Sequence, residues 1–384
     1  MRRAVAAGLL VALLAAPLQA QSGGHRLPRK WLFAAIGAVA SGAFGLIYAT
    51  SFERDIGGCS AAACVLTVST LGGALIGFMI GSEVDHLYNI RYSHAPPITL
   101  RGRALSLAVV PTDLTVREHT AFVTGQEGIE LVGTDPGFAR LGFKARGLRG
   151  IGPIASDSAR NELLVGTAAG LYRFPLRGDD PGAVTLQADI SALARRDGVL
   201  ALGLGTDLQL ALPDDSLRML DSARATGSRV MDLTWHGDST LWALTEEALI
   251  AYAADSSGAL TQVGSFPLPG IGRRIVITDS LAFVAAGSGG LYAVDIRDPA
   301  APVAVGNWSG ARFVYDVAAS GSLVYAAAGP EGLYVLRFAD GTFNPVGLSR
   351  GLGFVASVEA GDGAIFALDR AGGTLRRIEP VDHP

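Results

Sequence analysis

The chain has 384 residues, a formal net charge of −4 and two cysteines. This charge provides no basic surface of the kind that binds nucleic acid, and two cysteines are too few for a disulfide framework or a four-cysteine zinc site. Glycine accounts for 50 residues, about twice its usual share, in a chain that is 49% hydrophobic. This combination favours tight turns between short strands, because a disordered chain would have low hydrophobicity.

The first 20 residues have the layout of a secretory signal peptide. Arg2 and Arg3 precede an apolar run of about fifteen residues, and small residues end the segment at Ala20. An uncleaved anchor helix is the alternative. In either case we expect an exported chain, in which residues 21–30 form a short basic segment.

Two apolar runs of 20 residues follow, at 31–50 and 62–81. About 20 helical residues span the hydrocarbon core of a bilayer. Both runs carry small residues four apart, which form a smooth stripe on a helix and allow close helix packing. The stripe residues are Gly37, Ser41, Gly45, Gly73, Gly77 and Gly81. The pattern predicts a transmembrane hairpin over 31–82, with helices at 31–50 and 62–82. It resembles the glycine-zipper segments of bacterial envelope proteins. A pair of helices packed on a soluble domain is the alternative.

Cys59 and Cys64 lie between the two stripes, close enough in sequence for a disulfide if the compartment is oxidising. Two buried thiols are the alternative. Export followed by two crossings places the rest of the chain in the periplasm, whereas the cations before the first run oppose this orientation by the positive-inside tendency. The side of the 51–61 loop therefore stays open. Residues 83–98 end with two prolines within their last three positions and are expected to form a linker.

A hairpin pattern recurs seven times between residues 99 and 380. Each copy has an apolar strand, a turn and a second strand. The first apolar residues after the turn are separated by 42, 37, 41, 42, 42 and 42 positions; they are Ile129, Leu171, Leu208, Leu249, Leu291, Leu333 and Leu375. A strand-only repeat of this length is typical of a β-propeller. The sequence therefore predicts an all-β, seven-bladed propeller over 99–380.

Each unit has room for four strands. In the sixth unit we expect them at 312–317, 323–328, 333–338 and around 345–348. The seventh unit ends after three strands, and the apolar run at 99–110 precedes the first unit. We therefore expect that run to close the ring as the fourth strand of the last blade.

The segment GLYAVDIRDPAAPVAVG at 290–306, preceded by LAFVAAG and followed by RFVYDVAAS, resembles the LVIVD repeat of bacterial extracytoplasmic β-propellers. The likeness is strong over 273–347 and poor over 185–212, where the repeat spacing shortens. The resemblance implies the propeller fold and an extracytoplasmic location, and it implies no reaction.

Acidic side chains are the candidate residues of the central channel. Asp232 and Asp316 occupy the inner-strand aspartate position of that repeat, Asp113 is one residue out of register, and the fifth unit has Arg274 there. A ring of carboxylates could bind a cation such as calcium. Alternatively, each aspartate accepts hydrogen bonds from backbone amides at its own blade corner. Arg274 would neutralise part of the charge, which favours the second interpretation.

No catalytic motif is found: the chain lacks a zinc-protease HExxH, a serine nucleophile elbow with a plausible triad, and a phosphate-binding loop. We therefore expect a non-catalytic, membrane-anchored propeller that needs no cofactor and binds another envelope or membrane protein through its loops. One alternative is a ligand- or cation-binding propeller, such as a hydrolase or lyase, acting in its channel. Another is a hairpin that oligomerises in the membrane while the propeller caps it. The short unit at 185–212 and a loop at 211–228 depart most from the repeat.

Overall fold

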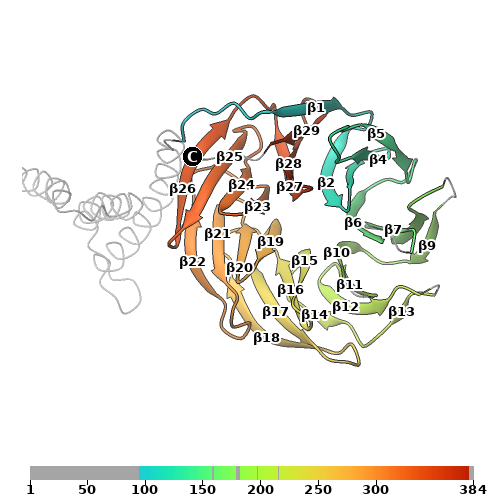
Figure 1. Cartoon of the computed structure of the whole chain (residues 1–384). Coiled ribbons are helices and arrows are strands. Elements are labelled where there is room, and N and C mark those ends of the chain that lie inside the picture. The colour runs from blue at the N-terminus through green and yellow to red at the C-terminus, as the bar shows by residue number, and fades with distance from the viewer. Residues whose placement is uncertain (1–94, 158–159, 179–181, 197, 215, 380–384) are drawn as a thin grey trace, which may run out of the picture. The chain divides into compact units, whose positions relative to one another are not determined.

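A computed structural model describes residues 95–157, 160–178, 182–196, 198–214 and 216–379 of the chain. These residues form seven antiparallel sheets arranged around a central opening, as Figure 1 shows. The prediction of an all-β, seven-bladed propeller is thereby confirmed. Within the described part of the chain, no helix is long and apolar enough to cross a membrane.

The seven blades follow one another along the chain, and in blades 1 to 6 the strands lie in sequence order from the axis outward. Blades 1 and 2 consist of β2 Pro111–Arg117, β3 Thr120–Gly125, β4 Gly128–Gly133 and β5 Arg140–Lys144, then β6 Ile151–Asp157, β7 Glu162–Thr167, β8 Leu171–Pro175 and β9 Ala183–Leu186. Blades 3 and 4 consist of β10 Ile190–Arg196, β11 Val199–Leu204, β12 Asp207–Leu212, β13 Arg218–Met219 and β14 Arg224–Ala225, then β15 Val230–His236, β16 Thr240–Thr245, β17 Ala248–Ala254 and β18 Leu260–Pro267.

The remaining blades repeat the same order. Blades 5 and 6 consist of β19 Arg274–Thr278, β20 Leu281–Ala285, β21 Leu291–Asp295 and β22 Val303–Trp308, then β23 Asp316–Ser320, β24 Leu323–Ala327, β25 Leu333–Ala339 and β26 Thr342–Ser349. Blade 7 consists of β27 Val355–Gly361, β28 Ala364–Asp369, β29 Thr374–Ile378 and, at its outer edge, β1 Gly102–Ser106.

The ring closes through strand β1, which comes from the start of the propeller and pairs antiparallel with β29, Gly102 lying opposite Ile378. The predicted closure is therefore confirmed. Glu130 holds the chain directly after β1: its fully buried carboxylate accepts hydrogen bonds from the backbone N–H groups of Ala108 at 2.7 Å and Val109 at 3.4 Å. Both ends of the propeller thus contribute strands to one sheet.

Two details differ from the sequence prediction. The innermost strand of blade 6 begins at Asp316 instead of residue 312, because Val314 pairs with the preceding blade: its N–H donates to the carbonyl of Gly287 at 3.0 Å. In blade 3, the stretch 211–228 was predicted as a loop, yet it contains β13 and β14. Both short strands pair with β12, so the outer edge of this blade is split.

Apolar side chains fill the space between neighbouring blades. Between blades 5 and 6, Phe283 lies 5.5 Å from Phe338 between ring centroids, and Trp308 lies 4.8 Å from Tyr334. Each large side chain buried in this way stabilises the fold by roughly 1.5–3 kcal/mol. Because one face of every blade packs on its neighbour, the positions near the axis are rigidly placed.

Candidate functional site

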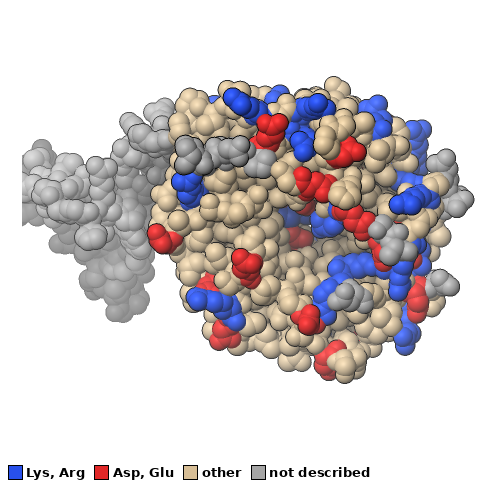
Figure 2. All heavy atoms as spheres, in the orientation of Figure 1, with Lys and Arg blue, Asp and Glu red and all other residues tan. Residues whose placement is uncertain are grey.

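The seven innermost strands place one equivalent residue each around the central opening. Each of these residues directly precedes an apolar residue that is buried between blades. We call the set the inner ring: Asp113, Pro153, Ala192, Asp232, Arg274, Asp316 and Ser357. In the space-filling view of Figure 2, the opening is hollowed and both acidic and basic side chains lie along its wall.

Arg274 connects the three predicted aspartates. Its Nη2 donates to both carboxylate oxygens of Asp113, at 2.8 and 3.0 Å, and its Nε donates to Oδ1 of Asp316 at 3.2 Å. The carboxylate of Asp232 lies 4.0 Å from Nη1. One guanidinium group therefore links blades 1, 4, 5 and 6 across the opening. A planar guanidinium has five donors, so it can serve several carboxylates at once.

The aspartates also bind backbone amides. Asp232 accepts from the N–H of Leu233 at 2.9 Å in its own blade and from that of Ile275 at 3.0 Å in the next blade. Asp316 does the same with Val317 at 2.7 Å and Val358 at 3.0 Å. This is the backbone-binding alternative expected from the sequence, extended to the neighbouring blade. These two aspartates thus act as cross-blade links.

The structure explains why Asp113 is one residue out of register with Asp232 and Asp316 in the sequence. In blade 1 the hairpin after the innermost strand pairs Arg117 with Thr120, whereas in blade 4 it pairs His236 with Thr240. The turn in blade 1 is therefore one residue shorter. Asp113 and Asp232 both lie four residues before the last paired residue of their strand, so they occupy the same structural position.

Burial and charge oppose each other in this cluster. Burial raises the pKa of the Asp316 and Asp232 carboxyls, and the neighbouring Arg274 partly counteracts the increase. For Arg274, burial disfavours the charge, but the carboxylates around it outweigh burial and hold its pKa well above the ordinary value. Glu359 lies nearby with its carboxylate 3.8 Å from Arg117, and burial raises its pKa to about 7.

The cluster was also a candidate cation site. A calcium ion requires about six to eight oxygen ligands, whereas the oxygens of Asp113, Asp232 and Asp316 receive N–H groups from Arg274 or the backbone. Among the residues that the structure describes, no group of three histidine, cysteine, aspartate or glutamate side chains has the arrangement of a metal site. In this structure the three carboxylates thus serve hydrogen bonds and ion pairs.

The other predicted site residues cannot be placed. The helix-packing residues and both cysteines lie outside the described residues, as do the predicted signal peptide and hairpin. These residues are Gly37, Ser41, Gly45, Cys59, Cys64, Gly73, Gly77 and Gly81.

A second ring of equivalent positions lies three residues before the inner ring, where each chain segment enters its blade. We call these positions the rim: Val110, Gly150, Asp189, Arg229, Ile271, Phe313 and Phe354. Over blades 5, 6, 7 and 1 the rim is apolar, and Ile271 and Val110 are 48% and 54% exposed. Over blades 3 and 4 it is charged and paired, because Arg229 donates from Nη2 to Asp189 at 3.0 Å.

The aromatic rim residues pack against the ring of Tyr315. Its ring centroid lies 4.5 Å from that of Phe313 and 5.2 Å from that of Phe354. The sequence analysis did not predict this feature. The sequence did contain a signal for it, because a bulky apolar residue stands three positions before Arg274, Asp316 and Ser357.

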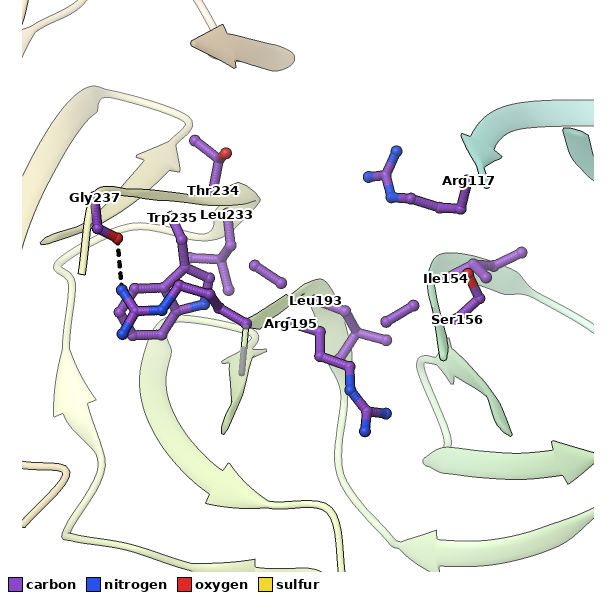
Figure 3. Close-up of a pocket in the computed structure, with 12 residues that line it drawn as sticks. Arg117, Ile154, Ser156, Leu193, Arg195, Leu233, Thr234, Trp235 and Gly237 are labelled. Atoms are coloured by element: carbon purple, nitrogen blue, oxygen red, sulfur yellow. Dashed lines mark hydrogen bonds between the residues drawn. The ribbon is translucent and has the colours of Figure 1, made fainter. Parts of the chain in front are cut away.

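A pocket of about 460 Å³ lies at the opposite end of the channel, between the final residues of β6, β10 and β15 (Figure 3). Arg195 pairs there with Asp157 at 2.6 Å, and the guanidinium of Arg196 stacks 4.5 Å above the ring of Trp235. Arg117 lies across from them in Figure 3. The pocket is therefore lined by one indole ring and by three guanidinium groups, of which that of Arg195 also pairs with Glu162 and that of Arg117 lies near Glu359.

The chain matches no family model, and no curated protein gives a significant match. The resemblance to the LVIVD repeat therefore stays a prediction. Among solved structures, the WD40 β-propeller domain of Doa1 is 15% identical with a TM-score of 0.56, over 74% of this chain and 97% of that domain. A chain of the mitotic checkpoint complex is 12% identical with a TM-score of 0.62, over 75% and 98%.

The computationally designed Ika8 protein is also similar in structure, at 13% identity and a TM-score of 0.51, over 74% of this chain and 99% of the designed chain. Identities this low establish the shared fold and nothing about activity, because one fold hosts many functions. The comparisons therefore support a β-propeller, a fold that commonly serves as a scaffold for protein interactions.

Proposed function

We propose that the protein is a non-catalytic interaction propeller, anchored in a membrane by residues 31–82 and displayed on the extracytoplasmic side, where its loops bind another envelope or membrane protein. The observation that carries this proposal is the position of Arg274. Its guanidinium group engages Asp113 and Asp316 directly and lies close to Asp232. The acidic residues that suggested channel chemistry are thus occupied in holding blades together, which leaves the loops as the working surface.

The neighbouring structures support this function by analogy. One of them is a chain of a multiprotein assembly, the mitotic checkpoint complex. A rigid ring with loops at both ends of its channel can present a broad surface to a partner, and loops on rigid scaffolds are the usual location of binding residues.

Cross-linking in intact cells tests the interaction. The full chain, carrying a small tag, is treated with a short amine- and carboxyl-reactive cross-linker, solubilised gently and examined by mass spectrometry. We expect reproducible cross-links between propeller loops and one other envelope protein. A chain that yields only intramolecular cross-links would contradict the proposal.

The proposed anchoring rests on the apolar runs at 31–50 and 62–81 and on the signal-like first 20 residues. Carbonate washing of membranes and protease treatment of spheroplasts test it. We expect the chain to remain with the membrane and the propeller to be cleaved from outside. Release of the chain by carbonate would contradict membrane anchoring. Protection of the propeller from external protease would contradict the proposed orientation.

The pocket of Figure 3 supports a second candidate function, the binding of a small anion in the channel. Arg117, Arg195 and Arg196 line it, and guanidinium groups bind carboxylates and phosphates through paired N–H donors. Thermal unfolding with millimolar citrate or inorganic phosphate tests this function. Stabilisation that disappears in Arg117→Ala supports it, and an unchanged unfolding temperature contradicts it.

A further inference from the structure

The rim over blades 5, 6 and 7 combines exposed apolar side chains with a fixed backbone. We call Ile271, Phe313, Tyr315 and Phe354 the apolar arc. Ile271 is 48% exposed, and the three aromatic side chains are half-buried, with the Tyr315 ring tilted against that of Phe313 and edge-to-face with that of Phe354. A contiguous apolar surface on a propeller face is typical of an interaction site, whereas single exposed apolar residues are common everywhere.

The arc is held rigidly by the turns beneath it. Gly329 has a φ of +56°, and a Cβ at this position would lie 2.6 Å from Tyr315 and 3.1 Å from Phe354. Its backbone also exchanges two hydrogen bonds with Val355, at 2.9 and 3.0 Å. Only glycine fits this conformation and this close contact. An aromatic surface that is already ordered loses little conformational entropy when it binds a partner.

Exposed arginines flank the arc residues along the chain. Three exposed arginines lie within four residues of an arc residue in the chain, and the backbone N–H of a fourth donates to the carbonyl of Phe354. None of the four pairs with a carboxylate of the described chain. They are Arg273, Arg312, Arg350 and Arg370.

Two carboxylates at the blade 6 and blade 7 end of the arc are already engaged. Glu331 accepts from the N–H of Arg312 at 2.9 Å and from the hydroxyl of Tyr334 at 3.1 Å, and the buried Asp369 accepts from backbone amides, including that of Phe354 at 3.0 Å. The opposite sector of the rim is neutralised by the Asp189–Arg229 pair. The exposed Glu246 lies at the Ile271 end of the arc, since its carbonyl accepts from the N–H of Gly272, so the rim is both basic and apolar over blades 6 and 7.

We infer that the apolar arc binds an extended acidic segment of a partner protein, with bulky apolar side chains resting on Phe313, Tyr315 and Phe354 and carboxylates reaching the surrounding arginines. This inference rests on the proposed interaction function and names its surface and partner chemistry. Aromatic and arginine side chains are the residues that most often dominate binding energy at interfaces. Arginine also pairs with carboxylates in a defined, two-bond geometry.

Selection of a random twelve-residue peptide library displayed on phage, against the purified full chain, tests the inference. We expect enriched peptides to contain several aspartates or glutamates and at least two bulky apolar residues. The enriched peptide is then synthesised with a fluorescent label and titrated at two salt concentrations. Its affinity should fall as salt rises, because exposed charge pairs are screened. A selection that enriches no such peptide overturns the inference.

Variants of the arc decide where the peptide binds. We expect Phe313→Ala with Phe354→Ala, and separately Arg312→Glu with Arg350→Glu, to weaken binding at least about tenfold. Phe313→Leu and Arg312→Lys should retain most of the affinity. Arg149→Glu is the matched control, since Arg149 is exposed next to the rim position of blade 2, and it should change affinity less than about twofold. Unchanged thermal unfolding shows that each variant folds.

Three results would overturn the inference: equal affinity of the peptide for the arc variants and the control, loss of binding in Arg149→Glu alone, or arginine-dependent binding to phosphatidylglycerol vesicles in place of peptides. The cross-linking experiment separates these from failure of the proposed function. If the arc variants still form cross-links to the same envelope protein, the proposed interaction function stands and the arc is not the binding surface.

Discussion

The inner ring and the rim lie three residues apart on the same seven chain segments, yet their side chains are used differently. In the inner ring, Asp316 is buried, Arg274 and Asp232 are largely buried and Asp113 is partly exposed, and these side chains pair with one another. In the rim, Phe313 and Ile271 remain partly or largely exposed beside arginines without carboxylate partners. The comparison indicates that the inner ring serves the fold, whereas the apolar arc stays accessible for the partner segment that we propose. Buried polar groups must be paired within the molecule, whereas exposed unpaired ones remain available.

Replacing Arg274 should have the largest effect on stability. Arg274→Ala removes the only guanidinium that the described inner ring contains and leaves the carboxylates of Asp113 and Asp316 close together. Breaking a buried ion pair by deleting one partner typically costs about 3–5 kcal/mol, which applies to the buried Asp316, whereas the partly exposed Asp113 contributes less. Urea unfolding followed by tryptophan fluorescence measures the loss.

Arg273→Ala is the matched control for this variant. Arg273 is the preceding residue, is exposed and belongs to the surroundings of the arc. We expect its free energy of unfolding to stay within about 0.5 kcal/mol of the parent, while peptide binding weakens. If the two variants were equally stable, the inner ring would not carry the structural role described above.

Glu359 should make stability depend on pH. Its side chain is 19% exposed, and burial raises its pKa from 4.5 to about 7. The folded state therefore binds a proton more tightly than the unfolded state, so this group's contribution to stability is greatest below pH 4.5 and declines as the pH rises to 7. At about 1.4 kcal/mol per pKa unit, the decline amounts to at most about 3 kcal/mol.

Glu359→Gln removes this titration. We expect the variant to match the parent near pH 4.5 and to be the more stable of the two at pH 8, in urea unfolding measured at both values. The charged neighbours Arg117, Arg274, Asp113 and Asp316 are unchanged in the variant, so the difference isolates Glu359. A variant that is less stable than the parent at pH 8 would show that the Glu359 carboxylate is stabilising in its charged form.

Gly329→Ala tests how tightly the arc is held. Gly329 and Gly321 both have positive φ values, +56° and +59°, but a Cβ at Gly321 would have no atom within 4 Å. Gly321→Ala should cost about 1–2 kcal/mol from backbone strain alone. Gly329→Ala should cost about 1–3 kcal/mol more, because the methyl group displaces Tyr315. Thermal unfolding compares the two, and equal losses would show that the aromatic stack yields easily.

The charged side of the rim should contribute least. Arg229 and Asp189 have side chains that are 42% and 37% exposed, and exposed ion pairs typically contribute about 0–1 kcal/mol. Arg229→Ala should therefore lower the free energy of unfolding by less than about 1 kcal/mol, measured in urea at low and high salt. A larger loss would assign this pair a structural role like that of the inner ring.

Much of the fold could be predicted from the sequence because a propeller repeats local patterns. Each hairpin is built from residues close in sequence, so the spacing of Ile129 and its six equivalents revealed the blade count. The spare strand at 99–110 could be assigned to the last blade because an open ring would leave an unpaired edge. The start of β23 was mispredicted because Val314 pairs with Gly287, and pairing between blades leaves no local signal.

The candidate site was only partly visible. The aspartates were identified because they recur at one position of the repeat, but the sequence did not show which groups they bind. The arc was missed because Phe313 and Tyr315 were assigned to an inner strand of blade 6, and because the packing of Tyr315 against Phe354 joins two blades.

By itself, the sequence determined the repeat length, the number of blades and the strand that closes the ring, because these depend on hydrophobic alternation and turns within about 42 residues. The tertiary structure alone decided that Arg274 reaches Asp113, which is 161 residues away in the chain. That contact exists because ring closure brings the first and fifth blades to the same axis. There, burial makes an unpaired charge costly and a shared guanidinium favourable.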